Sequence, residues 1–297
     1  MSGGSESLPA SVSLPPDAIA NPTSSNIQDP ENIAAYQVKG NNLQVIREKT
    51  DRWKDKANAI PPTYATEAHH SMLWSRFAEL IPANARQSLS EFEVFTDGPK
   101  GRDAYVGINE VGLDSFKMGI DVYASLPVRD PSGTQFAQTL IHEYAHILTL
   151  KPGQIDYDRT QEMSRAFKSR NQSAIKKMIK RCGDRVYFIQ GCANPSSYLH
   201  AFTKKFWAAD LQKWYQSLAF GRLHLSGLFE KNPSAFVSLY AASNPGEDIA
   251  ESWLAFVTGP EIGQAQTVAQ QKVAFFNAYP ELVRLRQQIR GVYKQKY

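Results

Sequence analysis

The chain has 297 residues and a mass of 33.2 kDa, which suits one large domain or two lobes that share a core. Hydrophobic residues make up 42% and charged residues 21% of it, values that exclude a wholly disordered or collagen-like protein. The net charge is 33 − 29 = +4, too small and too spread out to predict a nucleic-acid partner. No apolar run approaches the roughly 20 residues of a membrane-spanning helix, so we expect no transmembrane segment.

The chain has only two cysteines, Cys182 and Cys192. This number excludes a zinc site with four cysteine ligands and a scaffold held by several disulfides. The pair can form one bridge across a short loop, as an exported protein would favour, or it can remain as two buried thiols.

Residues 1–30 contain no Lys, Arg or aromatic residue and are rich in Ser and Pro. Such a segment cannot bury enough apolar surface to offset its ordering entropy, so it predicts a flexible tether. It lacks the basic and apolar regions of a signal peptide. One interpretation is a cytoplasmic protein with a loose N-terminus. The other, which we favour, is an exported or lipid-anchored protein whose export signal has been removed.

After this segment the apolar spacing is mostly helical. Apolar residues recur every three or four positions near 31–58, 64–80, 159–181, 196–220 and 266–295, which predicts helices. Residues 91–127 differ, because short β-branched and aromatic runs alternate with turn sequences; they predict two or three antiparallel strands. We therefore expect an α+β fold, mostly helical, with a small antiparallel sheet, in a single domain over 31–297.

A buried helix is predicted at 130–150, where the sequence is DPSGTQFAQTLIHEYAHILTL. A capping residue and a proline suit its start, and the Pro-Gly pair that follows Lys151 suits its end. Its second half is apolar on nearly every side, which is typical of a helix inside the core.

Three polar residues lie within this helix: His142, Glu143 and His146. The two histidines are four residues apart, so their rings share a face and can bind one metal ion. Glu143 lies beside that position and can accept a proton from a metal-bound water. This is the HExxH signature of zincin metallopeptidases. The alternative, two histidines bonded to backbone carbonyls, would bury three polar groups within five residues, which is costly without partners.

A catalytic zinc usually has three protein ligands and one open position. The extended HExxHxxGxxH pattern is absent, because Thr149 and Pro152 stand where the glycine and the third histidine would be. A downstream carboxylate is the remaining choice.

The best candidate helix is 244–260, NPGEDIAESWLAFVTGP, with Asn244 as its cap. Glu247 and Glu251 are four residues apart on one face, so one can reach the metal while the other accepts a ring N–H from a ligand histidine. The alternatives are that Glu247 only favours the helix start and that Glu251 is a solvated surface residue.

The two motifs, HEYAH and EDIAE, together resemble the gluzincin arrangement of HExxH plus ExxxE. The longer string FVSLYAASNPGEDIAESWLAFV is similar to the second active-site helix of the anthrax lethal-factor-like peptidases and of related bacterial secreted or lipid-anchored proteins. The resemblance covers about 130–258 and implies a zincin-like catalytic core. It implies that Glu247 is the third zinc ligand, that Glu251 supports a histidine ligand, and that Tyr240 hydrogen-bonds the transition state.

The resemblance therefore implies one Zn²⁺ per chain and hydrolysis of peptide bonds in a peptide or protein substrate, with Glu143 as general base. His146 and Glu247 are 247 − 146 = 101 residues apart, which implies a helical insert at about 159–220. We expect a monomer. Two alternatives stay open: a zinc-stabilised binding protein without catalysis, and an amidase that acts on cell-wall peptides.

Two further features carry no assigned role. The insert is basic and has no acidic residue from 163 to 183, which is typical of a solvated helix face, with a basic rim for an acidic substrate or anionic surface as the alternative. The other four histidines lack partners at metal-ligand spacing, so we interpret them as bystanders: His69, His70, His200 and His224.

Overall fold

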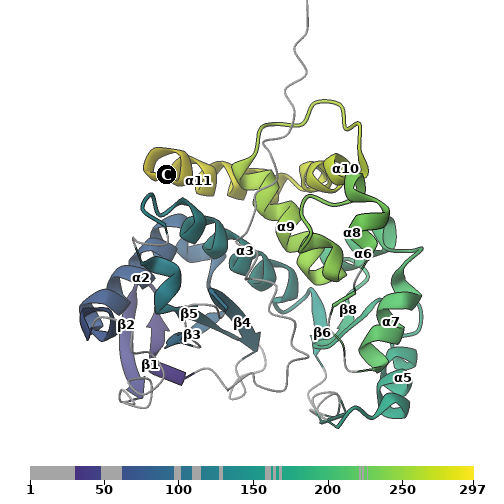
Figure 1. Cartoon of the computed structure of the whole chain (residues 1–297), viewed down its shortest axis with the longest axis horizontal. Helices are drawn as coiled ribbons and strands as arrows, with labels where there is room; N and C mark the ends of the chain where they lie inside the picture. The colour runs from purple at the N-terminus through teal and green to yellow at the C-terminus, as the bar shows by residue number, and fades with distance from the viewer. Residues whose placement is uncertain are drawn as a thin grey trace, which may run out of the picture. The chain divides into compact units, whose positions relative to one another are not determined.

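The computed structural model describes residues 31–47, 62–96, 102–108, 115–126, 130–157, 162, 165–166, 169–220, 222, 224–225 and 227–297. The tether predicted at 1–30 lies outside the described residues. The chain divides into two compact units. The five-stranded unit is the described part of Leu14–Leu148 and Arg284–Tyr297, and the three-stranded unit is the described part of Thr149–Val283. Figure 1 labels the elements of both units.

The five-stranded unit is built on a sheet with the strand order β2-β1-β3-β5-β4. The pairing of β3 with β5 is parallel, and the other three pairings are antiparallel. The prediction of a small sheet in an α+β protein is confirmed, but this sheet is larger than expected and mixed in direction. Its strands are β1 (Glu31–Lys39), β2 (Asn42–Arg47), β3 (Leu89–Thr96), β4 (Ala104–Ile108) and β5 (Phe116–Asp121).

The prediction of a helix near 31–58 is wrong for the described residues 31–47, which form the hairpin of β1 and β2. Lys39 pairs with Asn42, so the loop between the strands is only Gly40 and Asn41. Gly40 has φ 62°, a left-handed conformation that glycine adopts without strain and that two-residue hairpins need. Because four successive β1 residues from Ile33 are buried, the apolar run belongs to a strand covered on both faces.

Three helices accompany this sheet: α2 (Glu67–Leu80), α3 (Thr134–Leu150) and α11 (Pro280–Lys296). The unit boundary falls within α3 and within α11. The Thr66 hydroxyl caps α2 by accepting the His69 N–H, and Leu73 and Phe77 on the buried face of α2 are completely inaccessible. The predicted helix at 130–150 is present as α3, and the Asp130 carboxylate accepts the Phe136 N–H at 2.9 Å near its start.

The three-stranded unit contains a small antiparallel sheet of order β6-β8-β7. Its strands are β6 (Ile155–Tyr157), β7 (Tyr187–Phe188) and β8 (Gly191–Ala193). Its helices are α5 (Gln172–Arg181), α6 (Tyr198–Phe206), α7 (Leu211–Ala219), α8 (Leu228–Lys231), α9 (Pro245–Thr258) and α10 (Val268–Ala274). The short 3₁₀ helices η5 (Pro233–Ala235) and η6 (Ala241–Ser243) precede α9, and η7 (Phe275–Ala278) follows α10.

The helices predicted at 196–220 and 266–295 are each divided in two, into α6 and α7 and into α10 and α11. Within the described part of the chain, no helix is both long enough and apolar enough to cross a membrane.

Candidate metal site

The three HExxH residues lie on helix α3, and all three side chains are buried or half-buried. His142 is 5% exposed and Glu143 is 8% exposed, and His146 is half-buried. The two rings are one helical turn apart, with their centroids separated by 4.9 Å. Their Nε2 atoms are 3.2 Å apart. Two nitrogens bound tetrahedrally to one zinc at about 2.0–2.1 Å would be about 3.3 Å apart, so the spacing of the Nε2 atoms fits a shared metal ion.

Helix α9 begins as the sequence predicts. The Asn244 side chain accepts the N–H groups of Gly246 at 2.9 Å and Glu247 at 3.1 Å, and Pro245 occupies the first helical position. This cap fixes the first turn of α9, on which Glu247 is half-buried.

Three of the residues predicted from the sequence form a group that can hold a metal ion. One ligand atom from each of His142, His146 and Glu247 lies within 4.8 Å of the other two. Two imidazole nitrogens and one carboxylate oxygen are the donors found together in catalytic zinc sites, whereas calcium and magnesium sites are built from oxygen donors. The donor set therefore suits a transition metal such as zinc.

Glu251 lies one turn beyond Glu247 and is only 3% exposed. Its Oε2 atom accepts a hydrogen bond of 2.7 Å from the Ser238 hydroxyl. The alternative of a solvated surface Glu251 is therefore wrong, because the side chain is buried and bonded inside the protein. Its predicted support of a histidine ligand stays a prediction.

Tyr240 directly precedes η6 and is half-buried. Its ring lies 6.2 Å from the ring of His224, at an interplanar angle of 34°. Burial lowers the pKa of His224, and the negative charge of Glu247 acts in the opposite direction. The interpretation of His224 as a bystander rests on residue spacing alone. Spacing does not predict that it lies near Tyr240, because the chain between them is divided into the short helices α8 and η5 and irregular segments with no single period.

Two of the remaining histidines have hydrogen-bond partners within the five-stranded unit. His70 is completely buried, and its Nδ1 atom lies 2.6 Å from the Tyr36 hydroxyl. The Nε2 atom of His69 lies 3.3 Å from the Ser125 hydroxyl. Neither belongs to the three-residue metal group.

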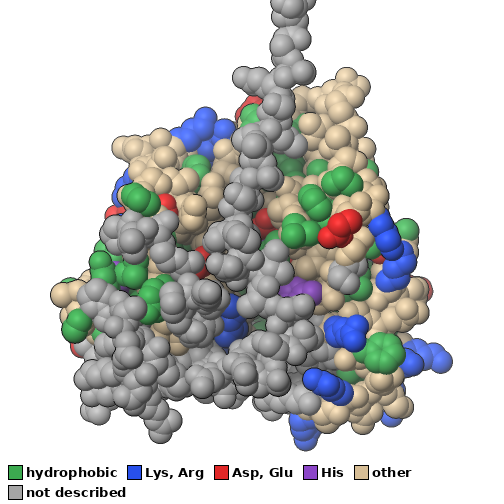
Figure 2. Space-filling model, in the orientation of Figure 1, with side chains coloured by type: hydrophobic (Ala, Val, Ile, Leu, Met, Phe, Trp, Pro, Cys, Tyr) green, Lys and Arg blue, Asp and Glu red, His purple; other side chains and the backbone are tan. Residues whose placement is uncertain are grey.

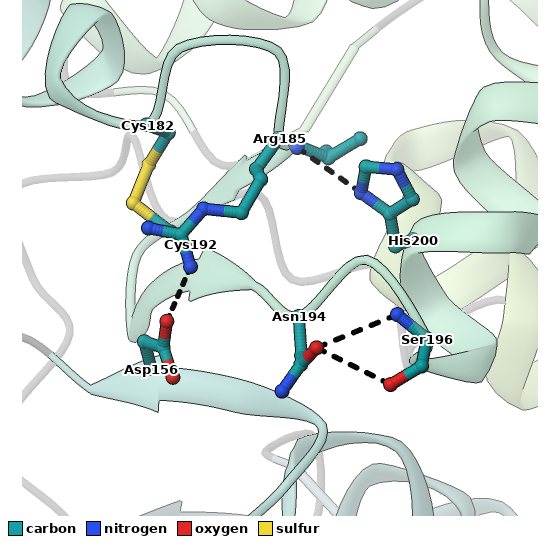
Figure 3. Close-up of polar contacts among 8 residues, drawn as sticks. Asp156, Cys182, Arg185, Cys192, Asn194, Ser196 and His200 are labelled. Carbon is teal, nitrogen blue, oxygen red and sulfur yellow. Dashed lines mark hydrogen bonds and ion pairs between the residues drawn. A yellow bond between two sulfur atoms is a disulfide. The ribbon is translucent and has the colours of Figure 1, made fainter.

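The two cysteines are joined by a disulfide with a Cα–Cα distance of 5.5 Å, and Figure 3 shows its surroundings. The bridge connects Cys182 at the end of α5 to Cys192 in β8. Arg185, which lies between α5 and β7, forms an ion pair with Asp156 of β6. His200 Nδ1 accepts the backbone N–H of Val186 at 3.4 Å.

The basic residues of the predicted insert that the structure describes lie largely on α5. Lys176, Lys177 and Lys180 are exposed, while the opposite face of the helix is buried through Ile175 and Met178. Figure 2 shows Lys and Arg side chains gathered where α5 and α7 lie in Figure 1. This is the solvated helix face that the sequence predicts.

No protein-family model matches the chain, and no curated protein or solved structure is significantly similar to it.

Proposed function

We propose that this chain is a zinc-dependent metallohydrolase, and specifically an endopeptidase of the gluzincin type. The observation that carries the proposal is the convergence of His142, His146 and Glu247, with their ligand atoms within 4.8 Å of one another. Glu143, the residue next to a proposed ligand, supplies the carboxylate that water activation requires.

Bound zinc would act as a Lewis acid that lowers the pKa of water and polarises the scissile carbonyl. Glu143 removes a proton from the attacking water as the new C–O bond forms. As the C–N bond breaks, Glu143 delivers that proton to the leaving amine nitrogen. The Tyr240 hydroxyl donates a hydrogen bond to the oxygen on which negative charge develops.

The proposal includes an extended peptide as substrate. Strand β4 is at one end of the strand order in the unit that carries His142 and His146, and an edge strand can pair with an extended peptide through backbone hydrogen bonds. The proposed location is outside the cytoplasm, because a disulfide such as Cys182–Cys192 persists in oxidising compartments.

Metal content tests the proposal without knowledge of the substrate. The chain would be purified without chelator or added metal, and zinc would be counted by elemental analysis in the native protein and in Glu247→Ala. We expect about one zinc per native chain and much weaker retention in the variant.

A native chain that contains no zinc and takes up none on titration would refute the proposal. A zinc-loaded chain that cleaves nothing in a broad peptide pool would favour a binding protein. Cleavage of cell-wall peptides alone would favour the amidase.

A further inference from the structure

A buried ion pair connects the first turn of α9 to α10. The Lys272 ammonium is 2.6 Å from Asp248 Oδ2, and the two side chains are 1% and 0% exposed. The indole N–H of Trp207 donates to the same carboxylate oxygen at 2.7 Å. The Lys272 ammonium also lies 3.8 Å from the centre of the Phe236 ring. We call these four residues the Lys272 cluster.

The Lys272 cluster is expensive to maintain if stability is its only role. Removing two charges from water carries a desolvation penalty that their attraction does not reliably recover, and apolar side chains of similar volume often serve a core equally well or better. The surroundings are suited to such a replacement, because Val273 and Phe276 beside Lys272 are buried apolar residues. Unlike apolar contacts, hydrogen bonds between charged groups have a preferred geometry, so they favour one orientation of the helices that carry them.

The cluster holds the first turn of α9, because Asp248 lies on that turn next to Glu247. Asp248 and Glu247 are consecutive, so their side chains leave the helix about 100° apart. A helix side chain extends about 5–6 Å from the axis, so a rotation of about 20° would move the Glu247 carboxylate by about 2 Å. Metal–ligand distances in well-formed sites stay within about 0.2 Å of their standard values. A contact that holds Asp248 therefore also determines where Glu247 points.

The cluster also holds the segment that leads to Tyr240. Phe236 packs against the Lys272 ammonium, and its ring is 5.9 Å from that of Trp207. Two residues later, Ser238 is bonded to Glu251 of α9. The segment that carries Tyr240 is thus attached to α10 through Phe236 and to α9 through Ser238.

From these contacts we infer that Lys272 is a positioning residue of the candidate zinc site, which orients Glu247 through Asp248 and the Tyr240 segment through Phe236. The inference rests on the proposed function, because it assigns Lys272 a role in that same site.

The test compares zinc affinity with fold stability in Asp248→Asn/Lys272→Met. This double variant removes one negative and one positive charge, so the net charge near the site is unchanged. Asn can still accept the Trp207 N–H, and Met has the length of the lysine stem. We expect the metal-free variant to unfold at a temperature close to that of the native chain, and its zinc dissociation constant to rise about 10-fold or more, as for other residues that orient metal ligands.

Zinc affinity would be measured by chelator competition. The visible absorption of the Co²⁺-loaded protein would report the coordination geometry, which a purely structural role would leave unchanged. Val273→Ala is the matched control, because it removes two buried methyl groups from α10 outside the cluster. It should lower the unfolding temperature and keep the native zinc affinity.

A double variant with native zinc affinity and a native Co²⁺ spectrum would overturn the inference. If the double variant does not fold, Phe236→Leu takes its place, since it removes the ring and keeps the ion pair; native zinc affinity in Phe236→Leu would likewise overturn the inference. A native chain that binds no zinc would instead refute the proposed function, and the role of Lys272 with it.

Discussion

The Ser238 hydroxyl donates a hydrogen bond of 2.7 Å to the Glu251 carboxylate, and both side chains are buried. The same hydroxyl accepts the backbone N–H of Ala241 at 3.0 Å. Ser238 therefore connects α9 to the chain on both sides of Tyr240, and a single oxygen atom holds a buried carboxylate and a backbone turn together.

Ser238→Ala should destabilise the metal-free protein by about 1–3 kcal/mol, because it removes a partner from a buried carboxylate and from a backbone N–H. Urea unfolding gives the free-energy difference. Ser234→Ala is the control, since Ser234 is exposed and its hydroxyl donates a hydrogen bond to the nearby Asn232 side chain. Equal stability of the two variants would show that the Ser238 hydroxyl does not support Glu251.

Glu143→Gln should keep its zinc and lose hydrolysis by at least about 100-fold, since an amide cannot accept the proton of the attacking water. The measurement is cleavage of a mixed peptide pool by mass spectrometry, together with the zinc count. Full activity in this zinc-loaded variant would eliminate Glu143 as the general base.

Tyr240→Phe should also keep its zinc, and hydrolysis should fall by about 100-fold, the usual effect of removing one donor to a developing oxyanion. Tyr293→Phe is the control, because Tyr293 lies on α11 and its hydroxyl accepts a hydrogen bond of 3.0 Å from Gln138 of α3. A similar small effect in both variants would remove Tyr240 from the proposed mechanism.

The Cys182–Cys192 bridge closes a loop with a sequence separation of 10 residues. A loop of this length corresponds to about 2–3 kcal/mol of stabilisation in the chain-entropy description. Cys182→Ser/Cys192→Ser should therefore unfold at lower urea concentration than the native chain. Reductant should shift the native chain toward the variant and leave the variant itself unchanged. If reductant leaves the urea midpoint of the native chain unchanged, the bridge does not stabilise the fold.

The sequence predicts α3, α9 and the residues of the metal group because each signal is local: a four-residue spacing, a capping asparagine, a terminal glycine. The sequence does not predict the strands at 31–47, because a run such as Ile33 to Tyr36 fits a buried helix and a buried strand equally well, and only the turn at Gly40 favours the strand. Contacts between distant residues left no periodic signal. Lys272 reaches Asp248 and Phe236 only after the chain has folded, and nothing in its own helix marks it as a buried residue.

Acid should destabilise the three-stranded unit in part through His200. Burial lowers the pKa of His200 below its usual 6.5, and the charges of Lys204 and Arg185 lower it further. The unfolded chain therefore binds this proton more readily than the folded one, so stability is complete above about pH 6.5 and is lost as the pH falls toward the lower folded-state pKa.

His200→Asn removes the titrating group and retains an oxygen that can accept the Val186 N–H. With chelator present, the fall in unfolding temperature from pH 7.5 to 5.5 should be smaller in His200→Asn than in the native chain. Between pH 7.5 and 8.5 the variant and the native chain should respond alike, because the imidazole is neutral there in both the folded and the unfolded state. An equal fall for both chains in acid would mean that His200 binds its proton as readily in the folded protein as in the unfolded one.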